Sequence, residues 1–214
     1  MENKYFTITI DGPAGSGKST LANLFAQKFD GFTYVNTGSM FRAIAYYLLK
    51  NQIDYKDEKL VNKILDQINI ELENDNVYLI ENKQKQNISN FIREPEISKI
   101  SSLIAQYDCV RKKLLNLQRE IASKQNVIMD GRDIGTKVLP NANIKIFLVA
   151  DITQRAIRRQ KQLLEQNINV DLKSIEQEIK LRDENDANRK NAPLIKPKDA
   201  FVIDLSLIHI SEPT

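Results

Sequence analysis

The sequence TITIDGPAGSGKST occupies residues 7–20 and combines three local patterns in a fixed order. The β-branched and aromatic run at residues 5–10 predicts a buried strand, and the spacing of apolar residues over 19–29 predicts a helix. Between them, residues 12–19 match the pattern G-x-x-x-x-G-K-[ST], and we call them the phosphate loop. A glycine-rich turn that leaves a strand and enters a helix is the context in which this pattern binds phosphate.

Glycine is concentrated in the phosphate loop, which holds three of the seven glycines in the chain. Because these positions lack Cβ atoms, the backbone N–H groups can surround a phosphate, and the following helix directs its positive end toward the same anion. Lys18 is placed to reach the β and γ phosphates, and the Ser19 hydroxyl is placed to ligate Mg²⁺. The sequence therefore predicts a nucleoside triphosphate site formed by Gly12, Pro13, Ala14, Gly15, Ser16, Gly17, Lys18, Ser19 and Thr20.

Strand and helix patterns alternate along the remaining chain. Runs of β-branched and apolar residues predict further strands at 32–35, 126–130, 144–149 and 200–204. Helical spacing of apolar residues or long polar stretches predict helices at 39–49, 96–106, 109–123, 153–166 and 172–189. This alternation predicts an α/β fold with a doubly wound, parallel five-stranded sheet and flanking helices.

Residues 52–92 differ from the rest, being rich in Asn, Lys, Glu and Gln. Two alternating runs at 68–72 and 77–80, separated by residues 73–76, predict a hairpin. We expect one domain over residues 1–214 that carries a small antiparallel β insert at about 52–92. The tail at 206–214, which includes His209, is assigned no function.

Composition excludes several classes of protein. The chain has 31 Lys and Arg against 28 Asp and Glu, and the net charge of +3 is too small to indicate a nucleic-acid partner. The single cysteine, Cys109, excludes an intrachain disulfide and a cysteine zinc cluster, and the single histidine excludes a multi-histidine metal site. No signal peptide is apparent and no apolar run approaches about 20 residues, so we expect a cytoplasmic protein without a membrane partner.

Two further glycine-containing loops follow predicted strands, and each carries an arginine. Residues 36–42 contain Arg42, and residues 130–136 contain Arg132. Because open α/β sheets bind ligands at the carboxyl ends of their strands, we expect these loops and the phosphate loop to converge on one crevice. Arginine binds phosphate through two parallel N–H bonds, so the crevice is expected to hold a second anion.

A second set of charged residues lies at 182–189. Arg182, Asp186 and Arg189 follow i, i+4, i+7 spacing, which predicts that they share one helical face and could grip a sugar phosphate together. A solvated, salt-bridged helix face is the alternative interpretation.

A third set opens the predicted helix at 153–166. Arg155, Arg158 and Arg159 are spaced to cluster, and we interpret them as part of a mobile lid at about 153–170 that closes on the transferring phosphoryl group. A basic surface helix is the alternative interpretation.

The sequence resembles the bacterial cytidylate kinases of the nucleoside monophosphate kinase group. The matching stretches are ITIDGPAGSGKST, NTGSMFRA, IREPEISKISS, DGRDIGT, IKIFLVA and EIKLRDENDANRKNAPL, and the resemblance extends to about residue 204. DGRDIGT together with RDxxDxNR is specific to this family, whereas the phosphate loop is not. The resemblance implies a P-loop kinase fold, a monomer, and transfer of a phosphoryl group from ATP, with Mg²⁺, to CMP or dCMP.

The resemblance also implies residue roles. The acceptor phosphate would meet Thr37, Arg42, Arg132 and Arg189. The cytosine would be read by Ser102, Arg111 and Asp133. The sugar and phosphate would lie near Arg182 and Asp186. Catalysis would rest on positioning and charge neutralisation by Lys18, Arg132, Arg155, Arg159 and Arg189. The insert would form part of the monophosphate-binding region.

Two positions depart from the family pattern. Asn36 stands where many relatives carry Asp, and Lys137 stands where an apolar residue is usual. We also expect the given sequence to lack the closing helix that the family places after the strand at 200–204.

Two alternative functions remain open at this point. A kinase of the same fold could act on UMP, AMP or a small alcohol such as shikimate, and an alcohol acceptor would need a carboxylate base, for which Asp133 could serve. A non-enzymatic nucleotide switch or an ATP-dependent nucleic-acid binder is the alternative from another class. That class is disfavoured because aromatic residues make up only 7% of the chain and tryptophan is absent.

Overall fold

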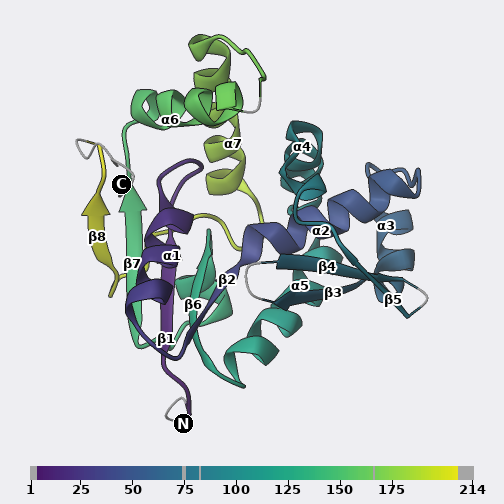
Figure 1. Cartoon of the computed structure of the whole chain (residues 1–214), viewed down its shortest axis with the longest axis horizontal. Coiled ribbons are helices and arrows are strands. Elements are labelled where there is room, and N and C mark those ends of the chain that lie inside the picture. The colour runs from purple at the N-terminus through teal and green to yellow at the C-terminus, as the bar shows by residue number, and fades with distance from the viewer. Residues whose placement is uncertain (1–3, 74–75, 82, 166, 207–214) are drawn as a thin grey trace.

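The computed structural model of the protein describes residues 4–73, 76–81, 83–165 and 167–206. Five parallel strands form the central sheet in the order β2-β6-β1-β7-β8 (Figure 1). Their bounds are Thr7–Asp11 (β1), Phe32–Asn36 (β2), Asn126–Gly131 (β6), Ile144–Val149 (β7) and Phe201–Asp204 (β8). The predicted α/β fold with a parallel five-stranded sheet is therefore confirmed. The centre of the predicted hairpin turn, at 74–75, and the tail from 207 onward, with His209, lie outside the described residues.

Helices pack on both faces of this sheet. The α-helices are Lys18–Lys28 (α1), Thr37–Lys50 (α2), Glu58–Ile64 (α3), Pro95–Ile104 (α4), Asp108–Ala122 (α5), Ile152–Glu165 (α6) and Leu172–Asn188 (α7). Shorter turns are η1 (Leu65–Gln67), η2 (Phe91–Arg93) and the π-helical η3 (Ile134–Val138). The helices predicted from the sequence are all present, whereas α3 was not predicted.

Alternation along the strands divides the core into two layers. Ile8 and Ile10 of β1 pack with α1 on one face, whereas Val127 and Met129 of β6 pack with α2, α4 and α5 on the other. Every residue of β1 is buried, because a central parallel strand has helices or neighbouring strands on all sides. The carboxyl end of β1 therefore lies in the interior, and the phosphate loop begins there.

The insert is a three-stranded antiparallel sheet in the order β3-β4-β5. Its strands are Asn69–Glu73 (β3), Asn76–Glu81 (β4) and Gln84–Asn87 (β5). The first two strands confirm the predicted hairpin. The third was missed because QKQN lacks any apolar alternation and is a strand only through its pairing with β4. The insert buries Ile68, Leu79 and Ile88 in the same apolar cluster as α2.

The carboxylate of Asp11 fixes the loop that follows β6. Its two oxygens accept hydrogen bonds from the backbone N–H groups of Ile134, at 2.8 Å, and Gly135, at 2.7 Å. Gly135 is required at this close approach, since a Cβ there would lie 2.9 Å from Thr9 Oγ1. Burial raises the pKa of Asp11 to about 6, although the two N–H donors lower it in part. The end of β1 thereby holds the start of η3 in place, two residues after Arg132.

No helix within the described ranges is both long enough and apolar enough to cross a lipid bilayer.

Asp11 is predicted to make the stability of the protein depend on pH. Because its pKa is higher in the folded protein than in the unfolded chain, the folded state binds more protons between about pH 4 and pH 6. Its contribution to the free energy of unfolding is therefore full below pH 4 and decreases by up to about 3 kcal/mol as the pH rises through 6.

The measurement is urea unfolding of the parent and of Asp11→Asn across this pH range. The stability advantage of the parent over the variant should shrink as the pH rises. An advantage that grows over the same range would show that the two N–H donors outweigh burial in setting the pKa of Asp11.

Candidate active site

The phosphate loop connects β1 to α1 and is held in a conformation that requires glycine. Gly17 precedes the first residue of α1 with a left-handed backbone (φ 95°). Gly12 lies so close to β7 that a Cβ there would be 2.4 Å from the carbonyl oxygen of Leu148. The loop therefore presents its backbone at the positive end of α1, as the sequence predicted.

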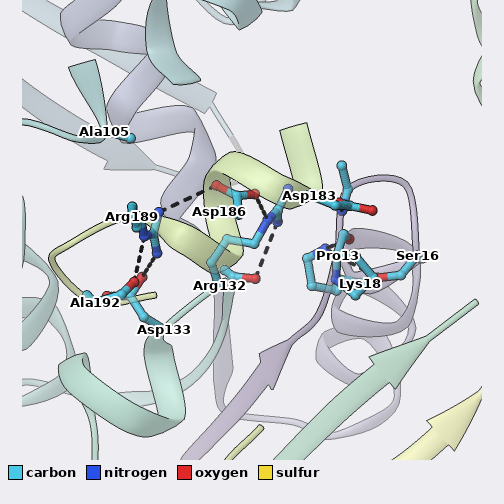
Figure 2. A network of polar contacts seen from close by, with 12 residues as sticks. Pro13, Ser16, Lys18, Ala105, Arg132, Asp133, Asp183, Asp186, Arg189 and Ala192 are labelled. Carbon is cyan, nitrogen blue, oxygen red and sulfur yellow. Dashed lines mark hydrogen bonds and ion pairs between the residues drawn. The ribbon is translucent and has the colours of Figure 1, made fainter. Parts of the chain in front are cut away.

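Lys18 lies within the curve of this loop. Its ammonium donates to the carbonyl oxygen of Pro13, at 2.6 Å, and to Ser16 Oγ, at 3.3 Å (Figure 2). Burial, followed by the positive charge of Arg132, lowers the pKa of Lys18 well below its usual value. Because burial and the charge of Arg132 disfavour the charged form of Lys18, an anion that binds beside the ammonium would stabilise it.

A charged pair from α6 and α7 grips the Ala14 peptide of the loop. Asp183 Oδ1 accepts from the Ala14 N–H at 3.0 Å, and the Arg155 guanidinium donates to the Ala14 carbonyl oxygen at 2.9 Å. Arg155 and Asp183 also form an ion pair with each other. Arg155 is only 6% exposed and donates in addition to the carbonyl oxygen of Ala150, at 3.0 Å. Sequence reasoning missed Asp183, because nothing in its spacing shows that it reaches a loop 169 residues away.

The three arginines of α6 do not cluster, which corrects the expectation from their spacing. Arg155 points into the phosphate loop, whereas Arg158 donates to the carbonyl oxygen of Leu205 at 2.8 Å. Arg159 lines a cavity of about 660 Å³ that also has Ser19 and Arg42 in its wall. Arg158 and Arg159 are adjacent, so their side chains leave the helix about 100° apart. Each of the three arginines therefore meets different surroundings.

A second, smaller cavity of about 180 Å³ adjoins the phosphate loop. Its wall is formed by the loop, the start of α2, the end of α4, the start of α5, the segment after β6 and the end of α7. All nine residues predicted to bind substrate line it, namely Thr37, Arg42, Ser102, Arg111, Arg132, Asp133, Arg182, Asp186 and Arg189. Lys18 and Ser19 lie in the same wall. The structure therefore brings these nine residues, which come from segments far apart in the chain, to the wall of one cavity.

Alternating charges connect the residues of this wall. Asp133 pairs with Arg111 and, at 3.1 Å, with Arg189. Asp186 pairs with Arg189 at 3.5 Å and with Arg132 at 2.7 Å (Figure 2). Burial alone would raise the pKa of Asp186, but Arg132 and Arg182 bring it below its usual value. We call these five side chains the ion-pair chain.

Arg189 corrects one detail of the prediction. It lies one residue beyond the end of α7, with an extended backbone (ψ 140°), rather than on the helical face of Arg182 and Asp186. Its Nε donates to the carbonyl oxygen of Ala192 at 2.6 Å. The turn of the chain after the helix thus places the Arg189 guanidinium between Asp133 and Asp186, as Figure 2 shows.

Two half-buried arginines, Arg42 and Arg182, add positive charge beside the ion-pair chain. Burial and the nearby charge of Arg132 lower the pKa of Arg182 to about 10 and also lower the pKa of Arg42. Arg42 Nε is buried without a hydrogen-bond partner among the described residues. A desolvated donor among like charges is a site for an anion with several acceptor oxygens.

Asp130 closes β6 beside the phosphate loop, and the sequence analysis did not assign it a role. It is 4% exposed, and its Oδ2 accepts from Ser19 Oγ at 3.0 Å. Burial raises the pKa of Asp130, which Lys18 partly offsets. The available signal was an acidic residue at the end of an apolar strand that neighbours the strand of the phosphate loop.

The donors near Ser19 fit Mg²⁺. A hydroxyl and a carboxylate are the hard oxygen ligands that Mg²⁺ prefers, and this ion usually keeps waters and phosphate oxygens as its other ligands. Within residues 4–206, apart from the gaps given above, no cluster of three or more His, Cys, Asp and Glu could hold a metal ion by itself. Lys137, the second departure from the family pattern, is exposed, which explains how a charge is accommodated there.

The Asp183 pair makes a prediction about stability. Asp183→Ala leaves the buried Arg155 without its carboxylate and the Ala14 N–H without its acceptor, so the free energy of unfolding should fall by about 3 kcal/mol. Glu184→Ala, at an exposed position of the same helix, should cost less than about 0.5 kcal/mol. Urea denaturation of both variants measures these losses. Equal losses would mean that the contacts of Asp183 with Ala14 and Arg155 contribute nothing to stability.

Comparison with known proteins gives a consistent result. The family model for cytidylate kinase matches residues 8–213. The chain is 44% identical over 205 residues to a cytidylate kinase of Fusobacterium nucleatum, covering 96% of this chain and 92% of that protein. It is 45% identical over 208 residues to a cytidylate kinase of Clostridium perfringens, with 97% and 94% covered.

Among solved structures, an uncharacterized protein from Eubacterium ventriosum superposes with a TM-score of 0.51 at 16% identity, covering 95% of this chain and 91% of that one. This likeness concerns the fold alone. The match of the family model over nearly the whole chain, together with relatives above 40% identity, shows that this chain belongs to the cytidylate kinase family.

Proposed function

We propose that this protein transfers the γ-phosphoryl group of ATP to CMP or dCMP, giving ADP and CDP or dCDP. The observation that carries the proposal is one continuous wall in which Lys18 and Ser19 of the phosphate loop stand beside nine residues of a second anion site. A kinase needs two phosphate groups held end to end, and this wall offers a place for each.

On the donor side, we propose that the phosphate loop at 12–19, with Thr20, surrounds the phosphates of ATP. Lys18 would move from the Pro13 carbonyl to the β and γ phosphates, since its present partners are weaker than a phosphate anion. Ser19 and Asp130 would hold Mg²⁺, which neutralises charge on the phosphate oxygens when bound.

On the acceptor side, we propose that Arg42, Arg132 and Arg189, with Thr37, hold the phosphate of the monophosphate. Arg42 brings a buried Nε without a partner among the described residues, and Arg132 and Arg189 bring guanidinium groups oriented by the ion-pair chain. Because those groups are already oriented by carboxylates, little side-chain entropy is lost when the phosphate binds. Arg182 and Asp186 would lie against the sugar.

Cytosine recognition is assigned to Ser102, Arg111 and Asp133. Cytosine presents an amino group where uracil presents a carbonyl oxygen, and a carboxylate accepts from an amino group but repels a carbonyl oxygen. The Arg111–Asp133 pair places a donor and an acceptor side by side, which matches the edge of cytosine.

The chemistry needs no strong base. The second pKa of a phosphate monoester is about 6, so the attacking oxygen is already mostly ionised near neutral pH. The residues instead position the two phosphates and offset their charge, and we propose Lys18, Arg132, Arg189 and Arg159 for this work. We propose that Arg155 contributes by fixing the loop, given its contacts with Ala14 and Asp183.

Two segments would complete the site. The insert at about 52–92 contributes Glu73, Asn76 and Ser89 to the larger cavity, which supports a role in the monophosphate-binding region. The segment at about 153–170 carries Arg159 into the same cavity, which supports a role as a lid that excludes water. On family grounds we propose that the protein acts as a cytoplasmic monomer on small nucleotides, without a nucleic-acid or membrane partner.

An alcohol acceptor is disfavoured by the ion-pair chain. Taking a proton from a hydroxyl would neutralise the Asp133 carboxylate and break its ion pairs with Arg111 and Arg189, whereas accepting a hydrogen bond from the cytosine amino group through a remaining lone pair leaves both ion pairs in place. The acceptor panel described next tests whether UMP or AMP is the preferred acceptor instead of CMP.

The direct test is ATP consumption with Mg²⁺ against CMP, dCMP, UMP, AMP and shikimate. CMP and dCMP should have the highest kcat/KM. Asp133→Asn should lower the preference for CMP over UMP by about tenfold, because the amide can donate to the uracil carbonyl. Its KM for ATP should stay unchanged. Asp66→Asn, at an exposed position of the insert, is the matched control and should keep the parent preference.

Preferential use of UMP, AMP or shikimate by the parent would refute the proposed substrate. An unchanged preference in Asp133→Asn would remove Asp133 from base recognition.

A further inference from the structure

Asn36, a departure from the family pattern, holds a fixed amide orientation at the end of β2. Its Oδ1 accepts from the Ser39 N–H at 2.9 Å and so caps α2. Its Nδ2 therefore faces the Tyr34 hydroxyl, at 3.0 Å. An amide nitrogen can only donate, so the Tyr34 oxygen must be the acceptor of this hydrogen bond.

This constraint sets the direction of the Tyr34 hydroxyl proton. With its oxygen accepting from Asn36, Tyr34 donates its proton to Asp130 Oδ1, at 3.2 Å. A hydroxyl without the Asn36 donor could rotate toward other acceptors. The helix cap thus favours, through two hydrogen bonds, the orientation in which the Tyr34 hydroxyl donates to the Asp130 carboxylate.

Asp130 then has one hydroxyl donor on each carboxylate oxygen. Oδ1 accepts from Tyr34, and Oδ2 accepts from Ser19 Oγ at 3.0 Å. Its backbone carbonyl accepts from Thr37 Oγ1 at 2.7 Å, so the residue is held at both ends. Because Asp130 is almost fully buried, water cannot replace a lost donor.

The Ser19 hydroxyl has a single proton, which it donates to Asp130 Oδ2. Its lone pairs are therefore directed away from the carboxylate. Ser19, Tyr34 and Asn36 line the 660 Å³ cavity together, which places the Ser19 oxygen at its surface. The hydrogen bonds Asn36→Tyr34→Asp130 and Ser19→Asp130 form one connected series.

We propose that Asn36 and Tyr34 are positioning residues that act through Asp130 to present the lone pairs of the Ser19 oxygen to the Mg²⁺ of a bound nucleotide. The inference rests on the proposed function, since it takes magnesium and a nucleoside triphosphate as the ligands. Neither residue touches the reacting atoms. The competing explanation is structural, with Asn36 only capping α2 and Tyr34 only linking β2 to β6.

Two variants separate these explanations. Tyr34→Phe deletes the hydroxyl and keeps the ring. Asn36→Ser keeps a side chain that caps α2 but removes the amide donor to Tyr34. Tyr78→Phe, in β4 of the insert, loses a tyrosine hydroxyl elsewhere and is the matched control.

The readout is calorimetric binding of ATP to the full chain, once with Mg²⁺ and once with EDTA, in the absence of any acceptor. The dissociation constant in EDTA divided by the dissociation constant with Mg²⁺ measures how much the metal strengthens ATP binding. Tyr34→Phe should lower this ratio about fivefold, and Asn36→Ser about twofold to threefold, with ATP binding in EDTA unchanged. The double variant should match Tyr34→Phe alone, since both changes interrupt the same series. Tyr78→Phe should keep the parent ratio.

Steady-state rates give a second readout. The Mg²⁺ concentration for half-maximal rate should rise about fivefold in Tyr34→Phe, while the KM for CMP stays at the parent value. A metal ratio equal to that of the parent in Tyr34→Phe, or equal losses with and without Mg²⁺, would overturn the proposal. Additive effects in the double variant would also overturn it. Should Tyr34→Phe fail to fold, the ratio for Asn36→Ser decides by the same criterion.

Failure here is distinct from failure of the proposed function. The binding experiment contains no pyrimidine nucleotide, so it can overturn the positioning role while the parent still phosphorylates CMP. A parent that phosphorylates no cytidine nucleotide would refute the function and leave the binding result standing.

Discussion

Confinement of like charge is the constraint on which this structure depends. Lys18, Arg42, Arg132, Arg182 and Arg189 all border one small cavity, and burial or mutual repulsion lowers the pKa of Lys18, Arg42, Arg182 and Arg189. Unpaired cations at this depth would destabilise the fold by several kcal/mol each. Asp133 and Asp186 make the arrangement tolerable by linking three arginines into a chain, yet they leave an excess of positive charge. That excess is what a pair of nucleotide phosphates can neutralise.

The parallel sheet explains how these charges reach one place. The phosphate loop, the start of α2 and the segment with Arg132 all follow the carboxyl ends of β1, β2 and β6, which are adjacent strands. Asp11 strengthens the arrangement by tying the end of β1 to the loop after β6. The helix α7 then brings Asp186 to the ion-pair chain and Asp183 to the phosphate loop, so one element contacts both.

Sequence reasoning succeeded where a pattern is local. The strand, turn and helix around the phosphate loop and the alternation of strands and helices could be predicted from local patterns, and the nine residues that short motifs proposed for substrate binding all line one cavity. It failed where a residue acts through a distant partner. Asp183 bonds to Ala14 from 169 positions away, and β5 exists only because β4 lies beside it.

Helical spacing was an unreliable guide to convergence. Arg155, Arg158 and Arg159 were expected to point together, but each found a different neighbour in the packed structure. Arg189 reached the predicted cavity from a position beyond the end of α7. Asp130 was missed because an acidic residue at a strand end acquires meaning only when Ser19 lies 3.0 Å away.

The central claim is that both nucleotides occupy one continuous, cationic cavity with their phosphates facing each other. The most direct measurement is the affinity of a single molecule that joins adenosine and cytidine through a chain of five phosphates. If the claim is correct, this compound binds at least about a hundredfold more tightly than ATP or CMP alone, because joining the two removes the entropy cost of the second association. An affinity no better than that of ATP would show that the two sites are not contiguous and would contradict the account.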